Sequence, residues 1–254
     1  MIGLIRAELV KTFKRRTFWV LTIVLTLLTG FLAGIFYLLP RVIDDQGGGF
    51  FEVAKPGAYI FGAGQVMGQT WFPLILATMA LAGELATSAW STTLTRNSRR
   101  GQHLVARLFT TTLSAWLAVL FAIGVFSIAT FFLASGSGEL DAAEWWDIAW
   151  KALLVQFTWV GVGLAFSSWL RSVGPAIGAA LAFSFVEGIL ILWEDFREVS
   201  LSIHTSALLG SLSVGGFGQF LSDLPTFRRG LIVVLGWSIL GVLISWAGLK
   251  LRDA

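Results

Sequence analysis

Long runs of apolar residues, separated by short polar segments, dominate the pattern of the chain. A helix rises about 1.5 Å per residue, so about 20 apolar residues cross a hydrocarbon core roughly 30 Å thick. Runs of this length occupy residues 18–39, 60–83, 108–133, 148–170, 174–193 and 230–249. They are continuously apolar, whereas strands of a membrane barrel alternate and are about half as long. The pattern predicts an all-α, polytopic membrane bundle of six transmembrane helices, forming one domain over residues 1–254.

Composition agrees with lipid as the main solvent of the chain. Of its 254 residues, 56% are hydrophobic and only 13% are charged. A soluble domain carries about 25% charged residues, which cover its surface. The first apolar run is longer than the roughly 7 to 15 residues of a signal-peptide core, and no Ala-x-Ala pattern follows it. We therefore expect this run to be retained as a span.

The connecting segments differ in charge on the two sides of the predicted bundle. Twelve basic residues face three acidic ones in segments 1–17, 84–107, 171–173 and 250–254. The opposite segments hold six basic and eleven acidic residues. Lys and Arg are held on the cytoplasmic side during insertion. We therefore expect a protein of the cell (inner) membrane with both termini on the cytoplasmic side. We expect the positive charge to face the lipid bilayer rather than nucleic acid.

The residues before the first span form a small amphipathic unit. Ile2, Ile5, Leu9 and Phe13 recur at helical spacing, and the charged side chains point elsewhere. This spacing predicts an interfacial elbow helix over residues 1–17. The alternative is a frayed basic N-terminus.

Residues 198–224 leave the topology open at one step. Their apolar residues are interrupted by six serines and by His204. We expect a re-entrant or interfacial segment on the outer side, before the last span. A seventh crossing is the alternative, and it would expel the C-terminus from the cytoplasm.

The sequence lacks the motifs that hydrolysis or phosphoryl transfer commonly needs. It has no Cys, and its two histidines, His103 and His204, lie too far apart for a His-x-x-x-His zinc site. Neither a Gly-x-x-x-x-Gly-Lys-[Ser/Thr] phosphate loop nor a Gly-x-Ser-x-Gly elbow is present. We expect no enzymatic activity and no cofactor in this chain, so energy for any work must come from an ion gradient or another polypeptide.

Glu187 is the single ionisable side chain well inside a predicted span. A charge at the centre of a span costs about 2.5 to 3.5 kcal/mol on insertion scales, so such residues usually face the bundle interior. Glu187 is a candidate for a substrate path or gate. The alternative is an outer-edge carboxylate that is reached by water or by Arg197.

Small residues recur at a spacing that lets helix backbones approach closely. Gly-x-x-x-Gly pairs occur at Gly30–Gly34, Gly64–Gly68 and Gly174–Gly178. We expect them to pack within the bundle, with a dimer contact as the alternative.

The segment from Glu84 to His103 joins the second and third runs. It contains an acid at the membrane edge, a short polar stretch, the basic cluster Arg96, Arg99 and Arg100, and the start of a return helix. This order suits contact with a cytoplasmic partner. An ordinary hairpin anchored by positive charge would have the same order.

The same segment resembles the loop between spans two and three of ABC-2 permeases. Glu84, Thr87, Leu94, Arg96 and Arg99 or Arg100 occupy places similar to those of the family's coupling loop. Residues 4–16 resemble the family's elbow helix, residues 163–172, with Arg171, resemble the end of span four, and residues 249–253 resemble its basic tail. The order of these motifs around six spans extends the resemblance over the whole chain.

The resemblance implies the membrane subunit of an ABC transporter of the drug, bacteriocin-immunity or ion-efflux type. Such a subunit works as a dimer with a second permease copy or homologue, above two cytoplasmic ATPase subunits that bind ATP and Mg. It implies an exporter or flippase of a hydrophobic or amphipathic substrate, coupled through Glu84, Thr87, Leu94, Arg96, Arg99, Arg100 and Arg171, and an outer re-entrant pair that favours six spans. A gradient-driven carrier or channel using Glu187, and a membrane scaffold or sensor without transport, are the alternatives.

Overall fold

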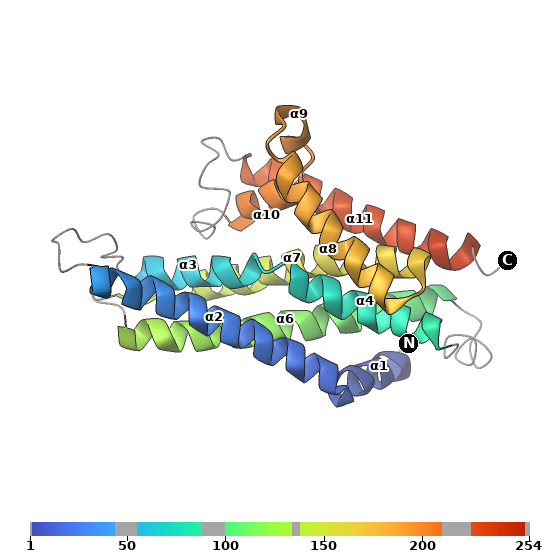
Figure 1. Cartoon of the computed structure of the whole chain (residues 1–254), viewed down its shortest axis with the longest axis horizontal. Coiled ribbons are helices and arrows are strands. Elements are labelled where there is room, and N and C mark those ends of the chain that lie inside the picture. Colours follow the sequence, from blue (N-terminus) through green and yellow to red (C-terminus); the bar gives the residue numbers. More distant parts are fainter. Residues whose placement is uncertain (1, 44–54, 88–99, 134–137, 210–224, 252–254) are drawn as a thin grey trace.

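A computed structural model describes residues 2–43, 55–87, 100–133, 138–209 and 225–251. Every regular element in these ranges is a helix, and the long helices form one elongated bundle (Figure 1). Five helical segments are long and apolar enough to cross a membrane, and a bent pair at the N-terminus is a sixth candidate. A helix satisfies its backbone hydrogen bonds internally, as a membrane span must, because lipid offers no partners for backbone N–H and C=O groups. The chain is therefore a multi-pass helical membrane protein.

The helices follow the order of the predicted spans. They are α1 (Ile2–Lys14), α2 (Arg16–Ile43), α3 (Lys55–Met67), α4 (Trp71–Ala86), α6 (Arg100–Leu133), α7 (Ala142–Leu170), α8 (Val173–Leu190), α9 (Glu194–Arg197), α10 (Leu201–Leu209) and α11 (Phe227–Leu251). Five predicted spans correspond to α2, α6, α7, α8 and α11, and the run 60–83 corresponds to α3 and α4 together. Several helices extend beyond their apolar runs, because backbone hydrogen bonding continues into the polar interface.

The second span is broken where one helix was predicted. α3 ends at Met67 and α4 begins at Trp71. Pro73 has no N–H to donate to the carbonyl of Gln69, which accepts from the N–H of Phe72 instead at 3.2 Å. The hydroxyl of Thr70 lies 3.0 Å from that of Ser184 in α8, so the break is held against a neighbouring helix.

α7 is the central helix of the bundle. It packs against α4, α6, α8 and α11, and 67% of its most apolar stretch is buried, against 17% of that of α8. A hydrogen bond of 2.7 Å between the hydroxyls of Thr158 and Ser238 joins α7 to α11 inside the core. The core therefore forms around α7, and most of the α8 surface is exposed.

Close backbone approach occurs at other glycines than those predicted. A Cβ added to Gly241 of α11 would lie 2.8 Å from the carbonyl carbon of Gly161 in α7. By contrast, a Cβ at Gly30, Gly174 or Gly178 would meet nothing within 4 Å. Packing within the bundle is therefore the wrong prediction for those three glycines, because their helix faces point away from the described helices.

The N-terminal helix pair is bent by 64° between α1 and α2. The indole N–H of Trp19 donates to the carbonyl of Phe13 at 2.8 Å, which satisfies one of the carbonyls left open at the end of α1. The rings of Phe13 and Phe18 meet edge to face with centroids 5.0 Å apart. α1 also packs along α6, so residues 2–14 are a regular helix with tertiary contacts. The frayed alternative does not describe them.

The segment after α8 reverses the chain through the short helices α9 and α10 (Figure 1). α10 has 9 residues, which rise only about 14 Å, less than half of a hydrocarbon core. The nine described residues of α10 alone do not cross a hydrocarbon core, and α10 packs against α11. The rest of the predicted re-entrant segment, residues 210–224, lies outside the described residues.

Candidate functional site

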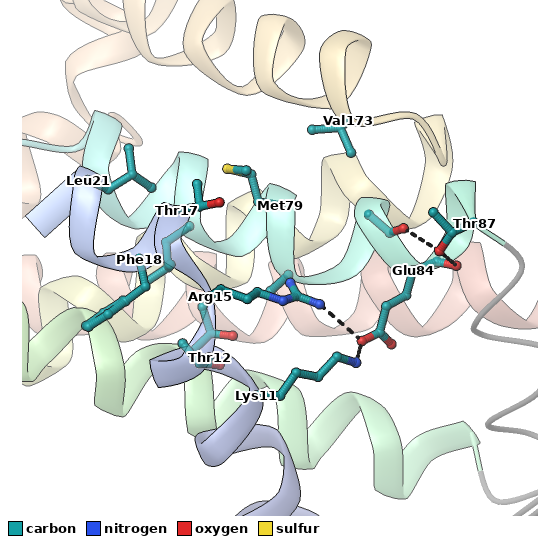
Figure 2. A pocket seen from close by; sticks show the side chains of 14 residues that line it. Lys11, Thr12, Arg15, Thr17, Phe18, Leu21, Met79, Glu84, Thr87 and Val173 are labelled. Carbon is teal, nitrogen blue, oxygen red and sulfur yellow. Dashed lines mark hydrogen bonds and ion pairs between the residues drawn. The ribbon is translucent and has the colours of Figure 1, made fainter.

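Glu84 lies in the last turn of α4, where it is buried with 3% of its surface exposed. Its carboxylate makes close ion pairs with Lys11 of α1 and Arg107 of α6. Nη2 of Arg15, at the bend between α1 and α2, lies 3.6 Å from Glu84 Oε1. Figure 2 shows Lys11 and Arg15 extending toward this carboxylate from the N-terminal helices. One buried acid therefore joins three separate segments of the chain.

A second carboxylate completes the group. Arg107 Nη2 also lies 3.4 Å from Glu8 Oε1 in α1. We call Glu8, Lys11, Arg15, Glu84 and Arg107 the Glu84 cluster. It holds three cations and two carboxylates, so its formal charge is +1. Arg107 is nearly inaccessible, with 2% of its side chain exposed, and a buried cation of this kind is tolerated only beside compensating acids.

Burial also changes the pKa values of the two partly exposed cations of the cluster, Lys11 and Arg15. Burial lowers the pKa of the Lys11 ammonium below its ordinary value, and the neighbouring Glu8 carboxylate opposes that effect. Burial likewise lowers the pKa of Arg15, with repulsion from Arg107 acting in the same direction. An arginine stays charged at neutral pH in spite of such a shift. The positive charge of the cluster therefore exceeds the negative charge of its two carboxylates.

A cavity of about 390 Å³ lies beside the cluster, between the N-terminal helices, α4 and the start of α8. Lys11, Arg15 and Glu84 line its polar part, and Phe18, Leu21 and Met79 line its apolar part (Figure 2). The cavity is therefore amphipathic, with charge at one side and hydrocarbon at the other.

The other residues of the predicted coupling set lie at the same end of the bundle or outside the described residues. Thr87 is exposed directly after α4, and its hydroxyl donates to the carbonyl of Gly83 at 2.9 Å. Arg171 ends α7 in the left-handed conformation, with φ of 52°, and begins the turn to α8. Val173 of that α8 start lines the cavity together with Gly83. Leu94, Arg96 and Arg99 are outside the described residues, and Arg100 is described only as the first residue of α6.

Glu187 occupies a second polar site at the opposite end of α8. It is 1% exposed and accepts hydrogen bonds from the hydroxyls of Ser200 and Ser202 and from the backbone N–H of Ser202, the last at 2.9 Å. These donors belong to the start of α10. A carboxylate there satisfies backbone donors and faces the positive end of the helix.

The partners of Glu187 differ from those considered in the sequence. Arg197 donates to the backbone carbonyl of Ile191 at 2.8 Å, and serines hold the carboxylate. The hydroxyl of Ser200 also accepts from the N–H of Ile203 at 3.3 Å, as a helix cap does. Glu187 and Ser200 together fix α10 to the end of α8.

His204 lies next to this site. Its Nδ1 is 2.7 Å from the carbonyl oxygen of Ser200, so Nδ1 carries the proton. Burial lowers the pKa of His204, which favours the neutral ring. Among the residues that the structure describes, no three His, Cys, Asp or Glu side chains converge in a way that could hold a metal ion.

Sequence reasoning identified Glu84 but missed its partners. Arg107 counted only as one basic residue of a connecting segment, and Glu8 and Lys11 counted only as the polar face of the first helix. The available signal was an acid ending one span and a base opening the next, since opposite charges at the same membrane edge attract.

Comparison with known proteins adds no relative, because neither a family model nor a curated protein matches this chain.

Proposed function

We propose that this chain is the permease subunit of an ATP-driven ABC exporter or flippase for a hydrophobic or amphipathic substrate. A separate cytoplasmic ATPase would bind ATP and Mg and act on the loop between α4 and α6. The observation that carries the proposal is the Glu84 cluster, which joins the two helices flanking that loop, α4 and α6, to the N-terminal helix α1.

A membrane subunit must pass force from its cytoplasmic loop to its helices. A loop on independent flexible ends would absorb the movement of a partner. Here the loop leaves α4 just after Glu84 and returns into α6 before Arg107, and these two side chains form an ion pair. Lys11 and Glu8 extend the connection to α1. Displacement of the loop would thus move α1, α4 and α6 together, as a rigid-body transition requires.

In this proposal Glu84 acts as a positioning residue. Its carboxylate is buried, so it cannot form the outer surface that a partner touches. Arg96, Arg99 and Arg100 would supply the contact, Thr87 the exposed start of the loop, and the turn at Arg171 an adjacent surface at the same end. Positive charge at this end supports a cytoplasmic orientation of both termini.

A second permease copy would complete the pathway. Gly174 and Gly178 of α8 point away from the described helices, and exposed Phe185 and Ile189 continue along the same helix. Small residues on an outward face let a second helix approach closely. This surface supports a dimer formed through α8.

The test is copurification from the native host in mild detergent, with the tag on this chain only. We expect an ATPase to copurify, at a complex mass that fits two permease and two ATPase subunits, and to hydrolyse added ATP. A stable chain that retains no nucleotide-hydrolysing partner under conditions that preserve a known ABC complex from the same cells would refute the proposal.

A further inference from the structure

The cavity beside the Glu84 cluster has the features of a lipid headgroup site. We infer that it binds the phosphate of an anionic phospholipid from the leaflet at the α1 end of the bundle, with Lys11 and Arg15 as ligands. This inference goes beyond the proposed function and holds whether or not an ATPase acts on the chain.

Charge complementarity is the first argument. The five ionisable side chains of the cluster carry a formal charge of +1, and a phosphodiester carries about one negative charge. Lys11 and Arg15 keep 41% and 37% of their side chains exposed, unlike Arg107. Arg15 Nη2 lies 3.6 Å from Glu84 Oε1, beyond hydrogen-bond distance. Its guanidinium therefore keeps donors for a phosphate oxygen, which it suits by geometry.

Glu84 also lines the cavity, and a carboxylate alone would repel a phosphate. Its charge is already shared between close ion pairs with Lys11 and Arg107. The nearest uncompensated charge to an incoming ligand is therefore positive. A phosphate between Lys11 and Arg15 would complete the neutralisation that the two acids begin.

The position of the apolar wall is the second argument. Phe18 and Leu21 belong to the first turns of the apolar run that opens α2, and Leu76 and Met79 lie deeper in α4 than Glu84. A ligand with phosphate at Lys11 and Arg15 would place hydrocarbon against these residues. Cationic side chains at a membrane edge attract anionic lipid in general, and here an adjacent apolar cavity adds room for the start of an acyl chain.

The experiment measures lipid binding to the full chain in detergent by native mass spectrometry, with dioleoyl phosphatidylglycerol and dioleoyl phosphatidylcholine as probes. The wild type should bind phosphatidylglycerol preferentially. Lys11→Gln with Arg15→Gln removes both ligands and should weaken that binding by about tenfold or more, since loss of a single charge-assisted hydrogen bond already corresponds to about tenfold. The matched control is Lys14→Gln with Arg16→Gln, two exposed cations of the same region outside the cavity.

A second variant keeps every charge. Gly83 lines the cavity, and a Cβ there would meet only Val173 Cγ2, at 4.0 Å, so Gly83→Leu should place its side chain in part of the cavity without a backbone clash at Cβ. The Gly83→Leu protein should lose the preference for phosphatidylglycerol and should elute as a folded protein in gel filtration. This variant tests the cavity even if the double variant fails to fold. Glycerol 3-phosphate, which offers the phosphate without acyl chains, should not compete at equal concentration.

Three outcomes would overturn the inference. The wild type binds the two lipids equally, the exposed control pair weakens phosphatidylglycerol binding as much as the cavity pair, or glycerol 3-phosphate competes as well as the lipid. The last result would assign the site to free phosphate compounds.

Discussion

Glu84 and Arg107 lie on opposite sides of the α4–α6 loop, 23 residues apart, and form a buried ion pair at its base. The loop is thereby closed by a charge contact where its two helices leave the bundle. Because Lys11 and Glu8 contact the same pair, the N-terminal helix is tied to that point as well.

Removal of Arg107 should destabilise the protein strongly. Arg107→Met leaves Glu84 buried with only half-exposed cations beside it, and breaking a buried pair costs about 3 to 5 kcal/mol. The free energy of unfolding can be measured by SDS titration in mixed micelles. Adding Glu84→Gln should recover part of the loss, since it removes a buried charge that has lost its buried partner. An Arg107→Met protein as stable as the exposed control Arg228→Met would show that the pair contributes nothing.

The contact between α7 and α11 should not tolerate a methyl group. Gly241→Ala places Cβ 2.8 Å from the backbone of Gly161, and overpacking of this kind costs about 1 to 3 kcal/mol. Gly236 lies on the same helix with nothing within 4 Å of its Cβ position. Gly236→Ala should therefore be neutral or slightly stabilising, because alanine favours helix. Equal midpoints for the two variants in thermal unfolding would contradict the observed packing.

Glu187 should hold α10 in place. Glu187→Gln replaces a charged acceptor of hydrogen bonds from Ser200 and Ser202, and loss of one such bond corresponds to about tenfold faster opening. Hydrogen exchange of the α10 amides should accelerate, with α11 unchanged and the protein folded. The control Glu198→Gln alters an exposed carboxylate of the same region, which pairs with Arg229 at 3.3 Å. Unchanged α10 exchange in Glu187→Gln would assign no anchoring role to Glu187.

The spans could be predicted from the sequence because each depends on a continuous apolar run. The tertiary partners could not. Arg107 reads as one of many basic residues at a membrane edge, and only the packing of α1 against α6 brings it to Glu8. The serine partners of Glu187 depend on a chain reversal after α8 that leaves no periodic signal. Gly161 and Gly241 are two of 28 glycines, and their approach depends on the crossing of two helices distant in sequence.

The break between α3 and α4 was also beyond the hydropathy pattern. Residues 60–83 remain apolar through it, so the run looks continuous. Pro73 was the available signal, and a proline in the first turn of a helix is compatible with a new helix start. Leu94, Arg96 and Arg99, which the sequence predicts to act in coupling, lie outside the described residues, and their proposed roles rest on the sequence.

Orientation can be mapped with single cysteines, because the chain contains none. Cysteines introduced at Ser98 and Ala254 should be shielded from an impermeant thiol reagent in intact cells. Cysteines at Ser137 and Ser206 should react from outside, since the excess of positive charge holds the other set in the cytoplasm. Labelling of position 98 or 254 from outside would reverse the orientation and with it the proposed side of ATPase binding.

In the proposed function, the loop between α4 and α6 transmits the action of an ATPase. The direct measurement is retention of the copurifying ATPase, together with its ATP hydrolysis, by a chain in which Arg96, Arg99 and Arg100 are each replaced by Glu. The control replaces Arg6, Lys14 and Arg16 with Glu. These residues are exposed at the same end of the bundle, so both triple variants change the net charge equally. Position 254 labelling must show normal orientation in each.

We expect the loop variant to lose the ATPase by about tenfold or more, because reversed charges at an interface add repulsion as well as removing attraction. The control should retain the ATPase at the wild-type level. A correctly oriented loop variant that retains the partner and its ATP hydrolysis in full would contradict the account, and would remove this loop from the mechanism.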